Sequence, residues 1–320
     1  MIVRWGLNEL DSLLAEIGIE QPFLVASDRW ADLPIRSTGR WNEVPSDRVA
    51  EAAAAAEGAD GLLAVGGGSA VDLAKALSAE TGLPLVSVPT TYSGSEWTSS
   101  FGIRDRHRRM KGGGSGAHPA GIAYEPRLTL ELPRDVSGGT ALNAIAHCAE
   151  ALYVTGRNEE GDRQALKGAS LLGKALPRVL DNGYDLEARM TLLQGAQHAG
   201  AALAAAGLAL GHAMAQAVGG RYGIAHGAAN ALCLPPALRF NEPVAADEIA
   251  RFGDALGTGD PPARVEELAR LAGFERLRDL GVPEDGLTEV ADATVVRGGA
   301  KANPRPATAE QVLELLRGVW

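Results

Sequence analysis

A continuous apolar run followed at once by three glycines restricts the fold of this chain more than any other feature of its sequence. The run covers residues 61–65, the glycines are residues 66–68, and a helical pattern extends from Ser69 to about Glu80. A strand that is apolar on both faces is buried on both sides, as in a parallel sheet covered by helices. The segment therefore predicts one strand–turn–helix unit of an open α/β sheet.

The same alternation of strands and helices extends over the first part of the chain, up to about Pro133. Residues 22–26 and 83–88 have the pattern of strands, and the Ala-rich residues 49–57 have that of a helix. Strands that are separated by helices pair in parallel through crossover connections. The fold predicted for residues 1–134 is therefore an α/β domain with a parallel sheet.

Helical patterns dominate the rest of the chain. The predicted helices cover residues 137–155, 163–180, 186–218, 227–240, 245–256, 262–273 and 308–319. Residues 135–320 are therefore predicted to form an all-α domain.

One stretch, residues 195–219, is apolar enough to imitate a membrane span, but it contains polar side chains such as His198 and His212. We favour a buried helix there and expect no membrane partner.

Charge and cysteine content limit the classes of partner. The formal net charge is −10, and a strongly acidic protein repels the phosphates of nucleic acids and of anionic membranes. The only cysteines, Cys148 and Cys233, each lie in an apolar run, which indicates a reducing compartment rather than a disulfide scaffold. The first residues carry no secretory signal pattern. We therefore expect a cytoplasmic protein that acts on a small molecule.

The three glycines predict a phosphate-binding turn. Glycine lacks a Cβ atom, so the backbone can approach a ligand closely, and the following helix offers unpaired N–H groups and the positive end of its dipole. The residues expected to bind the cofactor here are Gly66, Gly67, Gly68, Ser69, which can also cap the helix, and Asp72. A tight turn without a ligand is the alternative, but the position at the carboxyl end of a strand favours a dinucleotide.

A second loop, rich in hydroxyl groups, ends the next predicted strand. Its residues Thr90, Thr91 and Ser95 are expected to line the nucleotide cleft, although such turns are common without a ligand. Asp28 closes the strand at 22–26, where its carboxylate would accept hydrogen bonds from an adenosine ribose and repel a 2′-phosphate. This favours NAD over NADP as the cofactor. A helix cap or turn is the alternative role for Asp28.

A polar stripe runs along the helix predicted near residues 139–154. It consists of Thr140, Asn143, His147 and Glu150, whose spacing of three, four and three residues places them on one face. A solvated face is the usual interpretation of such a stripe. This one contains no Lys or Arg, and the rest of the helix is apolar. The stripe therefore favours the wall of a cleft.

Two further histidines indicate a site in the same domain. His212 lies near the end of the long helix, and His226 follows the break at 219–223, so a chain reversal would bring both imidazoles toward His147. A single histidine is more often a core or surface group, but three together favour a site. His198 is expected ~21 Å from His212 along a continuous helix. Three neutral imidazoles with one carboxylate suit a divalent transition metal. Without a metal, the imidazoles can still polarise or protonate a carbonyl oxygen.

These motifs resemble those of the iron-containing alcohol dehydrogenase superfamily, and most closely the maleylacetate reductases. The segments that carry the resemblance are GGGSAVDLAKA (66–76), VPTTYSGSEWT (88–98), YEPRLTLELP (124–133), NAIAHCAEALY (143–153), GHAMAQAVGGRYGIAHGAANA (211–231) and NPRPATAEQVLELLRGVW (303–320). The resemblance implies a dehydroquinate synthase-like architecture. Residues 1–134 would be the dinucleotide-binding domain and residues 135–320 a helical substrate and metal-site domain, with the active site in the cleft between them.

The resemblance also implies a metal site. Family members hold a divalent metal, Fe or Zn, with one Asp and three His. The matching positions in this chain are Asn143, His147, His212 and His226. The Asp-to-Asn change is similar to the maleylacetate reductases, which are generally thought to need no metal, so occupancy stays open. Gln216 departs from the family, in which a histidine associated with catalysis is common there.

The function implied by the resemblance is reduction of an oxo-acid by NAD(P)H. Maleylacetate to 3-oxoadipate, in aromatic compound catabolism, is the best named case, and a homodimer is expected. The substrate carbonyl would meet His147, His212 and His226. Its carboxylate would meet the basic loop 104–116 through Arg104, Arg106, Arg108, Arg109 or Lys111, for which a solvated loop is the alternative. The alternatives for function are a metal-dependent alcohol or polyol dehydrogenase, a sugar-phosphate cyclase or lyase of the dehydroquinate synthase type, and a dinucleotide-binding protein without catalysis.

Overall fold

The computed structural model describes residues 1–320, which divide into two compact units. Unit 1 contains residues 1–91 and 95–129. Unit 2 contains residues 130–320 together with the short segment Tyr92–Gly94. That the first unit binds a dinucleotide and the second a substrate stays a prediction.

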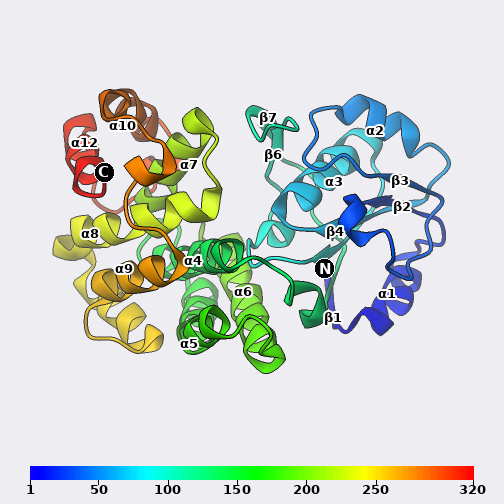
Figure 1. Cartoon of the computed structure of the whole chain (residues 1–320), viewed down its shortest axis with the longest axis horizontal. Helices are drawn as coiled ribbons and strands as arrows, with labels where there is room; N and C mark the ends of the chain where they lie inside the picture. The colour runs from blue at the N-terminus through cyan, green and yellow to red at the C-terminus, as the bar shows by residue number, and fades with distance from the viewer. The chain divides into compact units, whose positions relative to one another are not determined.

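Unit 1 is built around a six-stranded sheet (Figure 1). In order across the sheet, the strands are β1 (Ile2–Trp5), β8 (Gly121–Tyr124), β5 (Leu85–Pro89), β4 (Gly61–Gly66), β2 (Pro22–Val25) and β3 (Gly39–Trp41). Every pairing is parallel, and Leu62 of β4 lies opposite Phe23 on one side and Leu85 on the other. The sheet confirms the predicted α/β fold. It also contains β1, β3 and β8, which the sequence pattern does not predict.

Strand β4 is apolar throughout because helices cover both faces of the sheet. These helices are α1 (Leu10–Ile17) on one face and α2 (Val49–Ala55) and α3 (Gly68–Thr81) on the other (Figure 1). Leu63 and Val65 pack with α1, whereas Leu62 and Ala64 pack with α2 and α3, since successive side chains of a strand point to opposite faces. Burial of one such Leu or Val contributes about 1.5–3 kcal/mol. The run 61–65 therefore stabilises both layers.

The basic loop of unit 1 forms a hairpin. Strands β6 (Phe101–Arg104) and β7 (Met110–Gly114) pair antiparallel in a sheet of their own. Asp105 closes the turn between them, because its Oδ1 accepts hydrogen bonds from the N–H groups of His107 and Arg109, both at 2.9 Å. The basic segment 104–116 is therefore built largely on this antiparallel hairpin.

Unit 1 also buries a carboxyl group with few partners. Glu96 is 1% exposed; its Oε1 accepts a hydrogen bond from the Tyr124 hydroxyl at 2.9 Å, and its Oε2 has no partner. Burial raises the pKa of Glu96 above its ordinary value. The folded protein therefore keeps this proton at pH values where the unfolded chain has released it. The stability that the protonated group contributes is lost as the pH rises through the folded pKa.

We expect Glu96→Gln to raise the melting temperature at neutral pH, because a neutral amide removes the cost of ionising a buried carboxyl. The difference from the wild type should shrink as the pH falls toward the ordinary pKa of glutamate. Thermal unfolding across a pH series measures it, with the exposed Glu57→Gln as the control. A difference that is independent of pH would contradict the buried-proton account.

Unit 2 is helical, as predicted. Its helices are α4 (Arg134–Ala151), α5 (Glu159–Asp181), α6 (Leu186–Ala206), α7 (Leu210–Tyr222), α8 (His226–Leu256), α9 (Pro261–Ala272), α10 (Leu287–Val295), α11 (Gly298–Lys301) and α12 (Ala309–Gly318). Helix α4 is largely buried and packs against α5, α6, α8 and α9 (Figure 1). Helix α8 is interrupted by non-helical backbone at Ala245, in agreement with the two helical segments predicted there.

The single helix predicted over residues 186–218 is wrong. Helix α6 ends at Ala206, where Gly207 takes a φ of +94°, a conformation that other residues rarely adopt. Helix α7 then continues at an angle of 102° to α6, so the expected separation of His198 and His212 along one helix does not apply. No single helix is long and apolar enough to span a membrane. Helices α6 and α7 reach that length and composition only as this bent pair.

Candidate active site

The glycine turn between β4 and α3 presents free backbone N–H groups. Gly67 occupies the N-cap of α3 in an extended conformation, no side chain caps the helix, and the first turn contains no acidic residue. The prediction that Ser69 caps α3 is wrong, because the helix already begins at Gly68 and Gly67 takes the cap position. Uncapped N–H groups at the start of this 14-residue helix fit an anionic group such as a pyrophosphate.

The turn lies directly against the loop that follows β5. The Thr90 N–H donates to the Gly66 carbonyl oxygen at 2.9 Å, and a Cβ atom on Gly67 would lie 2.9 Å from Thr91 Cγ2. The Thr91 hydroxyl is buried and has no partner within the protein. The structure thus brings together the predicted glycine and threonine positions, with one hydroxyl that fits a polar group of a nucleotide.

Three other predicted cofactor residues have protein partners. The Ser95 hydroxyl donates to Asp72 Oδ1, and Asp72 Oδ2 accepts a hydrogen bond from the Gly102 N–H at 3.1 Å. Asp72 therefore fixes the chain that follows the second loop against α3. Asp28 is exposed, and its Oδ1 accepts a hydrogen bond from Asn42 Nδ2 at 2.9 Å. Cofactor contacts by these residues stay predictions.

We expect Gly67→Val to weaken NADH binding by roughly 10- to 150-fold, because the variant would lose about one hydrogen bond to a charged group. The new side chain would collide with Thr91 and cover the N–H groups at the start of α3. Titration of the full chain with NADH, followed by nucleotide fluorescence, measures the dissociation constant. Gly112→Val is the matched control, because a Cβ atom there has no neighbour within 4 Å. Equal affinities for the two variants would contradict a phosphate site at this turn.

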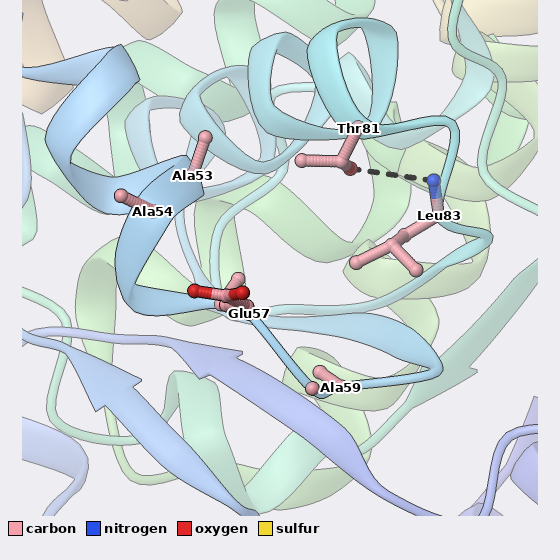
Figure 2. A pocket seen from close by; sticks show the side chains of 8 residues that line it. Ala53, Ala54, Glu57, Ala59, Thr81 and Leu83 are labelled. Carbon is pink, nitrogen blue, oxygen red and sulfur yellow. Dashed lines mark hydrogen bonds between the residues drawn. The ribbon is translucent and has the colours of Figure 1, made fainter.

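A pocket of unit 1 lies near the amino ends of strands β4 and β5 (Figure 2). Its lining includes Glu57, Ala59, Thr81 and Leu83, from the ends of α2 and α3 and the segments that precede β4 and β5. The Leu83 N–H donates to Thr81 Oγ1 at 3.3 Å across one side of it. Because the glycine turn follows the carboxyl end of β4 and this pocket precedes its amino end, the pocket is not part of the nucleotide site.

Unit 2 brings the three predicted histidines together. The ring centroids of His147 and His212 are 4.8 Å apart with nearly parallel planes, and those of His212 and His226 are 5.6 Å apart. They come from α4, from the first turn of α7 and from the first residue of α8. His147 and His212 are buried, and His226 is half-buried. We call these three side chains the histidine cluster.

Glu150 of the polar stripe orients His212. Its Oε2 accepts hydrogen bonds from His212 Nδ1 at 2.8 Å and from the Ala209 N–H at 2.7 Å, and its Oε1 accepts one from the His212 N–H at 3.1 Å. Since a carboxylate only accepts, His212 carries its proton on Nδ1 and leaves Nε2 bare. That Nε2 atom is buried without a partner. The Glu150 carboxylate also stabilises the N-terminus of α7, where the helix dipole favours negative charge.

Two asparagines hold the other two histidines. Asn143 precedes His147 by one turn of α4, and Asn230 follows His226 by one turn of α8. Asn230 Nδ2 lies 2.7 Å from Asn143 Oδ1 and 3.0 Å from His226 Nε2. Asn143 Nδ2 lies 3.0 Å from the Ser93 carbonyl oxygen and 3.3 Å from His147 Nε2. The sequence interpretation missed Asn230, although its four-residue spacing from His226 repeats that of Asn143 and His147.

Two packing features place these amides. A Cβ atom on Gly227 would lie 2.4 Å from the Gly139 backbone, so glycine allows α4 and the start of α8 to approach closely. The buried Arg189 guanidinium donates to the Tyr92 hydroxyl at 3.1 Å and to Ser137 Oγ at 2.7 Å. These bonds fix the segment Tyr92–Gly94, and with it the carbonyl group that Asn143 contacts.

His147 is held in its neutral form. Burial lowers the pKa of His147 well below its ordinary value, and the neighbouring imidazoles of His212 and His226 lower it further, because a charge on either would repel one on His147. Its Nδ1 atom is buried and has no partner. A Cβ atom on Gly94 would lie 3.4 Å from this nitrogen, so glycine allows the segment Tyr92–Gly94 to pass close to the imidazole. The cluster therefore presents a neutral, unpaired imidazole nitrogen in a buried setting.

The donor set does not fit the metal site that the resemblance implies. The Nε2 atoms of His147 and His226 and the Oδ1 atom of Asn143 each face an amide N–H, so hydrogen bonds already use the lone pairs that a metal would need. Among the three histidines, only His212 keeps an Nε2 atom without a hydrogen bond. No group of three or more His, Cys, Asp or Glu side chains is arranged to hold a metal ion.

The remaining predicted residues lie outside the cluster. His198 hydrogen-bonds a glutamine of α5 at 2.6 Å. In the hairpin of unit 1, Arg109 and Lys111 form ion pairs with Asp105 at 2.8 and 3.4 Å. Gln216 is half-buried on α7, one turn beyond the histidine of that helix. A role for the hairpin cations in binding a substrate stays a prediction.

Comparison with known proteins agrees with this arrangement. Residues 5–120 match the model of iron-containing alcohol dehydrogenases, and residues 138–320 match the C-terminal model of the Fe-containing alcohol dehydrogenase family. The maleylacetate reductase of Pseudomonas knackmussii is 38% identical over 82% of this chain and 74% of that protein. Two solved structures cover 100% of this chain and 95% of their own: a putative alcohol dehydrogenase from Ralstonia eutropha JMP134 (32% identity, TM-score 0.92) and the maleylacetate reductase of Rhizobium sp. strain MTP-10005 (28% identity, TM-score 0.89).

These matches, together with the glycine turn and the histidine cluster, define the class of the protein as an NAD(P)-dependent oxidoreductase. The chain belongs to the iron-containing alcohol dehydrogenase family, which confirms the resemblance of its motifs. The family is named for iron, whereas this chain has the amide of Asn143 among the four positions where the resemblance implies metal ligands.

Proposed function

We propose that this enzyme reduces maleylacetate to 3-oxoadipate with a reduced nicotinamide dinucleotide and without a metal. One observation carries the proposal: the buried histidine cluster contains Asn143 in place of a carboxylate and leaves His147 Nδ1 and His212 Nε2 without protein partners. The maleylacetate reductases that are 33–38% identical to the chain support this choice of substrate.

Unit 1 would hold the cofactor. The N–H groups at the start of α3 would bind the pyrophosphate, and the Thr91 hydroxyl would contact the nucleotide. Bound NAD(P)H supplies the hydride. We favour NADH over NADPH, because the carboxylate of Asp28 would repel a 2′-phosphate, and a comparison of the two dissociation constants tests this choice.

Unit 2 would stabilise the charge that the reaction creates. Hydride adds to the carbon of the C=C bond that lies farther from the ketone, and the π electrons move onto the ketone oxygen. The enolate then takes up a proton at the neighbouring carbon, so the substrate gains one hydride and one proton. A buried imidazole N–H stabilises the negative oxygen, because hydrogen bonds are stronger in a site with little water. The carboxylates of such a substrate need cations, for which Arg104, Arg106 and Arg108 are our candidates.

The test uses the purified full chain treated with a chelator. We expect NADH absorbance to fall when maleylacetate is added, and NMR to identify 3-oxoadipate as the product. Added Zn²⁺ or Fe²⁺ should not raise the rate. Activity confined to alcohols in the presence of a metal would support the alcohol dehydrogenase alternative, and no turnover of any oxo-acid would refute the proposal. Light scattering on the same sample tests the expected homodimer.

A further inference from the structure

We infer that Asn230 is a positioning residue and that Asn143 and Asn230 together form an amide clamp that fixes which nitrogen of His147 and His226 carries the proton. The effect on catalysis rests on the proposed function, whereas the clamp itself does not. Both asparagines are buried, and they join α4 to α8 through the 2.7 Å hydrogen bond between them.

The orientation of the clamp starts from the backbone. The Ser93 carbonyl oxygen can only accept a hydrogen bond, so Asn143 must turn its NH₂ group toward it, at 3.0 Å. The oxygen of Asn143 then faces Asn230, which must likewise present its NH₂ group. One carbonyl group thus settles the orientation of both amides, which their shape alone would leave undetermined.

The clamp determines the protonation of two imidazoles. The second N–H of Asn143 faces His147 Nε2 at 3.3 Å, and the NH₂ group of Asn230 faces His226 Nε2 at 3.0 Å. Both Nε2 atoms therefore accept, and each neutral imidazole keeps its proton on Nδ1. His147 consequently presents Nδ1–H, which has no partner, whereas His212 presents a bare Nε2.

This asymmetry assigns the roles within the cluster. A negative oxygen is stabilised by a donor, so the substrate ketone is assigned to His147 Nδ1–H, which has no partner within the protein, and not to the bare nitrogen of His212. Without the clamp, His147 could move its proton to Nε2 and would then offer the substrate an acceptor. Asn230 acts through Asn143 and His226, and it is therefore a positioning residue rather than a catalytic one.

A second amide pair in unit 2 shows what a purely structural contact looks like. Asn241 and Asn303 exchange two hydrogen bonds, at 2.9 and 2.7 Å, so that the oxygen of each is satisfied. Asn230 instead uses its nitrogen twice, and its own Oδ1 atom stays buried without a partner. An unpaired buried oxygen costs stability, which favours a role for the nitrogen beyond holding the two helices together. The arrangement is explained if the nitrogen must face both Asn143 and the imidazole.

The test compares Asn230→Asp and Asn230→Ala with Asn241→Ala, which removes a buried amide of the same helix away from the cluster. Asn230→Asp keeps the shape of the side chain but replaces the donor with an acceptor. We expect His226 to move its proton to Nε2 in this variant. Imidazole nitrogen NMR of the full chain, assigned with His226→Gln, would show this exchange. We expect kcat for maleylacetate to fall about 10–100-fold in both Asn230 variants, with an unchanged NADH dissociation constant.

Three results would overturn the inference. They are unchanged His226 nitrogen signals in Asn230→Asp, a wild-type kcat in Asn230→Ala, and an equal loss of kcat in Asn241→Ala at matched melting temperature. If Asn230→Ala does not fold, the isosteric Asn230→Asp decides the question alone. If the wild type does not reduce maleylacetate, the proposed function fails, and the NMR signals still decide whether the clamp exists.

Discussion

Replacing His147 with phenylalanine is expected to lower kcat for maleylacetate by roughly 10²–10³-fold, which is the usual effect of removing one hydrogen-bond donor that stabilises a developing oxyanion. The phenyl ring is flat and aromatic like the imidazole, although one atom larger, so it can still stack on His212, whose centroid lies 4.8 Å away. It has no N–H group at the Nδ1 position. The dissociation constant of NADH should not change, because His147 is proposed to donate to the substrate, whereas the pyrophosphate is expected at the N–H groups that start α3.

The matched control is His198→Phe, which removes a histidine from the same unit that contacts α5 and not the cluster. Single-turnover kinetics with preloaded NADH separate the reduction step from product release. A His147→Phe rate within a few-fold of the wild type, at equal melting temperature, would contradict the role of His147 as the donor. A weakened NADH affinity in this variant would show that it acts through the cofactor instead.

The strand, turn and helix at residues 61–81 could be predicted because their causes are local. The continuous apolar run of β4 indicates that the strand is buried on both faces, and the glycines that follow it indicate the turn. Strand β1 could not be predicted in this way. It pairs with β8, with Ile2 opposite Gly121, and its residues are only half-buried, so it lacks the apolar run that marks β4.

The candidate site could be predicted in part for the same reason. The four-residue spacing of Asn143 and His147 places them on one helix face, and the interruption of the helical pattern before His226 indicates that the chain reverses direction there. The role of Asn230 depends on how closely α4 and α8 approach at Gly139 and Gly227, which is a tertiary contact without a local pattern. The predicted long helix fails for a related reason, since one positive φ at a glycine outweighs the helical tendency of the alanines around it.

The residue at position 143 decides whether the cluster can hold a metal, and Asn143→Asp is expected to create a metal site. In the variant, a carboxylate and three imidazoles would form a favourable donor set for Zn²⁺, once the ion displaces the Asn230 N–H from His226 Nε2. Without the ion, one oxygen of the new carboxylate would face the Ser93 carbonyl oxygen, which now accepts a hydrogen bond from Asn143. We therefore expect the metal-free variant to be less stable by about 3–5 kcal/mol, the usual cost of an uncompensated buried charge, because only the neutral Asn230 N–H would donate to the carboxylate.

Zinc should restore this stability, because an ion that binds only the folded protein adds about 4 kcal/mol at a concentration of roughly 1,000 times its dissociation constant. Thermal unfolding with and without Zn²⁺ measures the effect, and the wild type should show no comparable shift. Asn241→Asp is the matched control, since it buries a carboxylate on α8 beside Asn303 instead of beside the histidines. Zinc should not stabilise it. A similar zinc shift in the wild type would show that the amides of the clamp yield to a metal, and the metal-free chemistry proposed for this enzyme would then be wrong.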